Sequence, residues 1–147
     1  YNSLNSKNNI TSLFDLSYSE GAFIAKENLE ATFLKIKSPN KLPVFVLDKE
    51  NLMSIFYSFS RSKDINFKQH PVFSNRFFLY GEDRKAIRSL FSSDLISFFE
   101  SQPTYHVESN GRNVLIKGGD RLASIEEIKK MMAFAEGLGD VLSKKGS

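Results

Sequence analysis

The segment TYHVESNGRNVLIK, residues 104–117, constrains the fold of this chain more than any other part of the sequence. Asn110 and Gly111 suit a two-residue turn in which both residues take positive backbone angles, and such turns join antiparallel strands. A turn at this place sets apolar residues opposite each other on one face: Val107 with Val114, and Tyr105 with Ile116. The sequence therefore predicts a β-hairpin with one buried face, and with it an antiparallel pair of strands.

Other segments also have the pattern of strands. Phe14, Leu16 and Tyr18 alternate with polar residues, which is the period of a strand with one buried face. The stretch KENLEATFLKIK fits either period, and we expect a strand because Pro39 and Asn40 interrupt the chain soon afterwards. LPVFVL, residues 42–47, is extended. The aromatic run VFSNRFFLY is expected to fill both sides of a central strand, through Phe73, Phe77, Phe78, Leu79 and Tyr80.

Three segments are predicted to form helices. Asp48 is a suitable N-cap for the first, whose apolar stripe is Leu52, Ile55, Phe56 and Phe59. After Gly81, Asp83 caps a second helix with Ile87, Leu90 and Phe91 facing inward, and residues 92–94 restart or continue it through Leu95, Phe98 and Phe99. Ser124 and Glu127 form a capping box before a third helix, whose apolar seam is Ile128, Met131, Ala135, Leu138 and Leu142. Gly137 and Gly139 indicate a bend or a close contact in it.

These segments together predict an α+β fold. We expect an antiparallel or mixed sheet of about six strands, with three helices packed mainly on one face. Residues 1–12 are polar and follow neither hydrophobic period, so they are interpreted as a flexible leader to a single domain, 13–147. A domain of this length buries about 70% of the surface of its unfolded chain, which is enough for a real core.

Composition excludes several classes of function. The 20 Lys and Arg residues are spread through the chain and nearly balanced by 17 Asp and Glu residues, so the sequence does not predict nucleic-acid binding. The absence of cysteine excludes disulfides and thiolate metal sites. His70 and His106 are the only imidazoles, and neither has the spacing of a metal site, so we expect no metal and no cofactor. His106 lies on the hairpin face opposite Val107, where a structural role is favoured.

The same residues give little support to catalysis. No serine lies in a nucleophile-elbow pattern, and Glu82 and Asp83 are better explained as helix-capping acids than as a metal pair. One alternative stays open, in which His70 works with Asp64 or Asp83 in an aromatic pocket of an enzyme or small-ligand-binding protein. We favour a turn residue before Pro71 and expect no catalytic residues.

A group of basic residues surrounds the junction at Gly81: Arg76, Arg84, Lys85 and Arg88. Three cations on one face could contact an acidic protein partner or an anionic lipid surface. The competing interpretation is a solvated face paired with Glu82, Asp83 and Asp94. We keep the basic group as a candidate contact site.

The sequence resembles a bacterial family of a domain of unknown function, many of whose members carry predicted membrane helices upstream of the domain. The resemblance runs from about Leu13 to Val141 and is carried by residues 14–18, 43–50, 64–67 and 73–91. Where relatives often read Arg-Pro-Glu, this chain has Asp48, Lys49 and Glu50, so that position need not keep a rigid turn. The resemblance implies a bacterial source and membrane association, and it implies no activity or cofactor.

We therefore expect a non-enzymatic binding or scaffold domain of a bacterial membrane-associated protein. It would act through protein or lipid-headgroup contacts, with this part of the chain on the cytoplasmic side. Self-association through the seam of the last helix, residues 131–142, is a further partner hypothesis.

Overall fold

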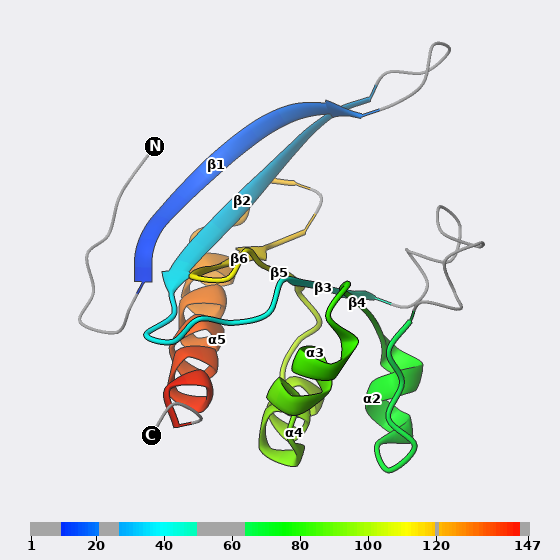
Figure 1. The fold of residues 1–147 in the computed structure, drawn as a ribbon. Coiled ribbons are helices and arrows are strands. Elements are labelled where there is room, and N and C mark those ends of the chain that lie inside the picture. The colour runs from blue at the N-terminus through cyan, green and yellow to red at the C-terminus, as the bar shows by residue number, and fades with distance from the viewer. Residues whose placement is uncertain (1–9, 21–26, 50–63, 120, 145–147) are drawn as a thin grey trace.

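The computed structural model describes residues 10–20, 27–49, 64–119 and 121–144 of the chain. Six strands form one sheet in the order β1-β2-β6-β5-β3-β4, and each neighbouring pair is antiparallel. The helices of the described part, α2 to α5, lie together on one side of this sheet (Figure 1). The predicted α+β fold, with an antiparallel sheet and helices mainly on one face, is confirmed.

The first two strands form a long hairpin. β1 (Ile10–Glu20) begins within the segment predicted as a leader, where Ile10 pairs with Ile36 of β2 (Glu27–Lys37). Only residues 33–37 of β2 pair with β6, so the rest of the hairpin extends beyond the sheet as a two-stranded ribbon (Figure 1). Both faces of β2 are used, because Leu34 lies in the core while Phe33 stacks on Phe14 at 5.5 Å on the other face.

The hairpin of β5 (His106–Ser109) and β6 (Asn113–Lys117) is confirmed, but its predicted register is wrong. Val107 pairs with Ile116, and Ser109 pairs with Val114, a shift of two residues on β6. The two central residues of the turn are Gly111 and Arg112, not Asn110 and Gly111, because the Asn110 amide donates to the Asn113 carbonyl at 3.1 Å and the Asn110 side chain accepts from the Asn113 amide at 2.9 Å. A two-residue shift keeps every side chain on its original face, so the predicted apolar face remains buried.

β3 (Phe45–Lys49) and β4 (Phe77–Tyr80) complete the sheet. The predicted N-cap at Asp48 is wrong, because Asp48 and Lys49 pair with β4 as part of β3. The rest of that predicted helix, with Leu52, Ile55, Phe56 and Phe59, lies outside the described residues. The prediction that the aromatic run forms a central strand is also wrong, since β4 lies at an edge of the described sheet.

The first half of the aromatic run is a helix, α2 (Pro71–Arg76), where a strand was predicted. Pro71 occupies the first helical position, which suits its fixed backbone angle. Contacts with α4 then satisfy the ends of both helices. The Phe73 amide donates to the Glu100 carboxylate at 3.2 Å, and the Arg76 guanidinium donates to the Glu100 carbonyl at 2.8 Å. These contacts between distant residues outweigh the strand preference of the local sequence.

The predicted cap at Asp83 is confirmed, since Asp83 accepts from the Ala86 amide at the start of α3 (Arg84–Leu90). Residues 92–94, which were expected to restart or continue this helix, start a separate one, α4 (Ser93–Ser101), where Ser92 accepts from the Leu95 amide. The capping box precedes α5 (Ile125–Lys144), with the Ser124 hydroxyl bonded both to the amide and to the carboxylate of Glu127. None of the described helices is both long and apolar enough to cross a membrane.

The core lies between the sheet and the helices. It contains side chains from both layers, among them Leu34, Leu47, Phe73, Ile87, Phe99, Val107, Ile116 and Phe134. The predicted seam of α5 takes part in it through Met131, Ala135, Leu138 and Leu142, all of which are buried. Gly137 marks a close contact, because a β-carbon there would lie 2.7 Å from the Phe98 ring.

Candidate functional site

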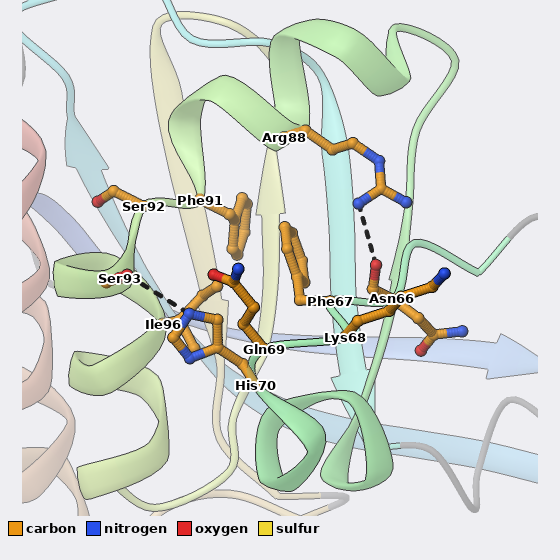
Figure 2. A pocket seen from close by; sticks show the side chains of 10 residues that line it. All are labelled: Asn66, Phe67, Lys68, Gln69, His70, Arg88, Phe91, Ser92, Ser93 and Ile96. Carbon is orange, nitrogen blue, oxygen red and sulfur yellow. Dashed lines mark hydrogen bonds between the residues drawn. The ribbon is translucent and has the colours of Figure 1, made fainter.

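An open pocket of about 520 Å³ lies between the turn at residues 66–70, the end of α3 and the start of α4 (Figure 2). Its lining is Asn66, Phe67, Lys68, Gln69, His70, Arg88, Phe91, Ser92, Ser93 and Ile96. We call it the α3–α4 pocket. Of these residues, only His70 and Arg88 were predicted from the sequence as site candidates.

Hydrogen bonds fix the segment that forms one wall of this pocket. The Ile65 amide donates to the Leu79 carbonyl at 2.8 Å, which joins the segment to β4. The Ser74 hydroxyl of α2 accepts from the Phe67 amide at 2.8 Å, and the His70 amide donates to the Phe67 carbonyl to close a turn. The turn at 66–70 is therefore held in place from two sides, so its side chains have a defined position against α3 and α4.

Aromatic rings form the inner surface of the pocket. Phe67 and Phe91 lie nearly parallel, with ring centroids 6.3 Å apart and an interplanar angle of 25°. Phe73 contacts both rings, at 5.8 Å from Phe67 and 6.0 Å from Phe91, and is fully buried. Since Phe73 in turn packs on Phe77 of β4, the aromatic surface is continuous with the core and is rigidly supported.

Cationic and neutral polar groups surround this aromatic surface. The Arg88 guanidinium donates to the Asn66 carbonyl at 3.0 Å and lies 5.3 Å from the centre of the Phe67 ring (Figure 2). These two contacts fix the plane of a group that has five N–H donors. Lys68 lies on the same rim and is exposed. None of the ten lining residues is acidic, so the pocket favours an anionic ligand.

His70 and Ser93 face each other across the pocket, with the imidazole Nε2 3.4 Å from the hydroxyl oxygen (Figure 2). A serine nucleophile needs a base that a third group orients. Asp64 does not orient His70, because its buried carboxylate accepts a hydrogen bond from the Leu79 amide at 2.9 Å. Burial raises the pKa of Asp64. Asp83 caps α3 instead. Neither acid lines the pocket with His70, so the geometry does not form the acid–histidine pair of the alternative hypothesis.

The four basic residues singled out in the sequence have different positions. Arg88 lines the pocket, whereas Arg84 and Lys85 are exposed on α3 outside it. The Arg76 guanidinium donates to the carbonyls of Glu100 and Gln102 and to the hydroxyl of Thr104. Arg76 therefore caps the C-terminal end of α4. Of the four, Arg88 is the residue that the fold presents to a ligand in this pocket.

A second charged cluster lies on the sheet face opposite the buried Val107. His106 Nδ1 is 2.6 Å from Asp48, and its Nε2 is 2.7 Å from Glu108. Burial lowers the pKa of His106, but hydrogen bonds to both carboxylates outweigh burial and raise it to about 9. Burial would raise the pKa of Asp48, but the hydrogen bonds from His106 and the Lys49 amide, together with the charges of His106 and Lys117, outweigh burial and lower it. The charges of this cluster satisfy one another, which indicates a structural role and agrees with the interpretation of His106 from the sequence.

The described residues do not hold any group of three His, Asp or Glu side chains that is placed to bind a metal ion. The α3–α4 pocket is therefore the candidate site, and its chemistry is that of recognition by cations, hydroxyls and aromatic rings.

No family model and no curated protein matches the sequence. Among solved structures, the crystal structure of the mycobacterial trehalose monomycolate transport factor A is similar to this chain, with a TM-score of 0.54 and 10% sequence identity. The match covers 94% of this chain and 75% of that chain. At this identity the similarity shows a shared fold.

Proposed function

We propose that this chain is a non-enzymatic binding domain of a bacterial membrane-associated protein, and that the α3–α4 pocket binds the anionic headgroup of a membrane lipid. The observation that supports this most directly is the lining of the pocket, which combines Arg88, Lys68 and His70 with two phenylalanine rings and has no acidic residue.

Phosphate is the anion that best suits these groups. A guanidinium held in one plane matches two phosphate oxygens, and a lysine on a flexible stem adds a second positive charge. The hydroxyls of Ser92 and Ser93 and the Gln69 amide lie around the same space and can bond to a polar headgroup. Phe67, which is only partly buried, offers an apolar contact to the carbon skeleton of glycerol or a sugar, and the buried Phe91 ring supports it from behind.

Two similarities support a role at a membrane. The structural neighbour is by its title a transport factor for trehalose monomycolate. The family that the sequence resembles often carries membrane helices upstream of this domain. We propose from the latter that this domain is held at the cytoplasmic face of a bacterial membrane, where the positive pocket rim would meet anionic lipid.

A second candidate role is binding of a free small anion or of an acidic protein partner in the same pocket. The contact of His70 with Ser93 in an aromatic pocket favours a small-ligand site over a purely structural turn. Self-association through α5 also remains a proposal, although its apolar seam is buried within this chain. Partner surfaces on α5 would therefore need to use its exposed residues.

Vesicle sedimentation tests the headgroup proposal. The protein is mixed with vesicles of phosphatidylcholine alone, or of phosphatidylcholine with phosphatidylglycerol, and the bound fraction is measured. The variant Lys68→Gln/Arg88→Gln removes the two cations of the pocket. The matched control, Arg84→Gln/Lys85→Gln, removes one arginine and one lysine from exposed positions on α3 outside the pocket.

We expect binding to the anionic vesicles and little binding to the neutral ones. Each cation near an anionic surface contributes about 1 kcal/mol, so the loss of two should weaken binding of the pocket variant about thirtyfold. The control variant should lose much less of its affinity for anionic vesicles than the pocket variant does. Equal losses in the two variants would show that general basic charge, and not the pocket, accounts for binding. No preference for anionic vesicles would contradict the proposal itself.

A further inference from the structure

An exposed apolar pair adjoins the α3–α4 pocket. Pro71 and Val72 follow the pocket residue His70 directly and begin α2. Val72 is 62% exposed, whereas the next residue, Phe73, is fully buried. The start of α2 thus presents a branched apolar side chain to solvent beside the rim of a cationic pocket.

The residues before this pair are basic or polar. Lys68 and Gln69 are exposed in the turn that leads to His70, and Arg88 lies across from them on α3. Residues 68–72 therefore read Lys-Gln-His-Pro-Val, an apolar tip next to cations with no acid between them. This combination suits the boundary between lipid headgroups and acyl chains, where apolar groups enter and cations stay at the phosphates.

We propose that residues 68–72 dock on an anionic bilayer, with Pro71 and Val72 entering the headgroup layer. The mouth of the α3–α4 pocket then faces the membrane, and a headgroup enters the pocket while its acyl chains remain in the bilayer. This inference rests on the proposed function, and it adds the orientation of the domain and the residues that penetrate.

The hydrogen bonds that hold the turn at residues 66–70 support docking of this kind. Hydrogen bonds from the Ser74 amide to the His70 carbonyl, and between the Ser74 hydroxyl and Phe67, hold the start of α2 against the pocket wall. The apolar tip and the pocket mouth are thus parts of one rigid unit. No ordering of a flexible segment is needed on docking, which favours reversible binding at a surface.

Tryptophan fluorescence tests the inference, because the chain contains no tryptophan. Val72→Trp places a single fluorophore on the proposed tip. The matched control, Ile125→Trp, places it at another exposed apolar position, 73% exposed, at the start of α5. Each variant is mixed with anionic vesicles, with neutral vesicles, or with glycerol 1-phosphate, which carries the headgroup chemistry without a bilayer.

We expect the emission of Val72→Trp to shift to shorter wavelength with anionic vesicles, and its quenching by acrylamide to fall about threefold or more as the indole leaves water. Ile125→Trp should show neither change. Val72→Asp should weaken sedimentation with anionic vesicles by about fivefold or more, while its affinity for glycerol 1-phosphate stays that of the wild type.

The outcomes separate the inference from the proposed function. If Val72→Trp sediments with anionic vesicles and its spectrum does not move, the domain docks through another face and the inference is overturned. Binding of glycerol 1-phosphate without any binding to vesicles overturns both the inference and the proposal of a membrane lipid, and leaves the pocket as a site for a free small anion. Failure to bind either one removes that second candidate role as well.

Discussion

The bridge that His106 makes between β3 and β5 gives a prediction about stability and pH. Both nitrogens of the ring lie within 2.7 Å of carboxylate oxygens, one from Asp48 and one from Glu108. A ring that donates from both nitrogens carries a positive charge. Exchange of His106 for Gln removes this charge and at least one of the two bonds, and leaves two acids near each other.

The magnitude follows from the pKa of His106, which rises from its ordinary value of 6.5 to about 9. Each unit corresponds to about 1.4 kcal/mol, so the charged ring contributes about 3 kcal/mol to stability. The folded pKa lies above the unfolded one. The contribution is therefore fully present below about pH 6.5 and is lost as the pH rises through about 9.

Urea unfolding of the wild type and His106→Gln at several pH values between about 6 and about 10 measures this contribution. We expect the variant to be less stable by about 2 to 3 kcal/mol at the acidic end, and the gap to narrow as the pH rises. His70→Gln controls for the exchange of histidine for glutamine outside the cluster. A gap of constant size across the range would refute the assignment of a cationic ring.

Three further changes test contacts of the fold. Arg76→Ala should lower the free energy of unfolding by about 2 to 4 kcal/mol, because it leaves the carbonyls at the end of α4 without their donor. Gly81→Ala should cost about 1 to 3 kcal/mol, since the new β-carbon would lie 2.5 Å from the Val44 carbonyl oxygen, whereas Gly119→Ala, with no atom within 4 Å, should cost little. Ser124→Ala should cost about 1 kcal/mol through loss of the α5 cap. Chemical denaturation of each variant beside the wild type checks all three, and an unchanged midpoint in any of them contradicts the contact concerned.

Features that depend on neighbours in the sequence could be predicted. The caps at Asp83 and Ser124 require only a side chain and an amide a few residues later, so the sequence pattern was sufficient. The faces of β5 and β6 were also predictable, because alternation places Val107 and Val114 on one side whichever register the turn selects.

Features that depend on distant contacts could not be predicted. The helix at 71–76 is stabilised by hydrogen bonds to residues 100–104, which lie at the end of α4 and just after it. Nothing within the aromatic run itself indicates these hydrogen bonds. The pocket has the same origin, because hydrogen bonds to Ser74 and Leu79, which lie later in the chain, hold the segment around the turn at 66–70 in place against α3 and α4. The hydrogen bond between His106 and Asp48 likewise joins two residues that are 58 positions apart in the sequence.

The central claim is that the α3–α4 pocket recognises a phosphate-bearing headgroup, and titration with glycerol 1-phosphate followed by amide chemical shifts tests it most directly. The account predicts saturable shifts that are largest at Phe67, Lys68 and Ser93, and that disappear in Lys68→Gln/Arg88→Gln with the rest of the spectrum unchanged. Shifts that gather elsewhere on the domain, or none at concentrations where anionic vesicles bind, would contradict it.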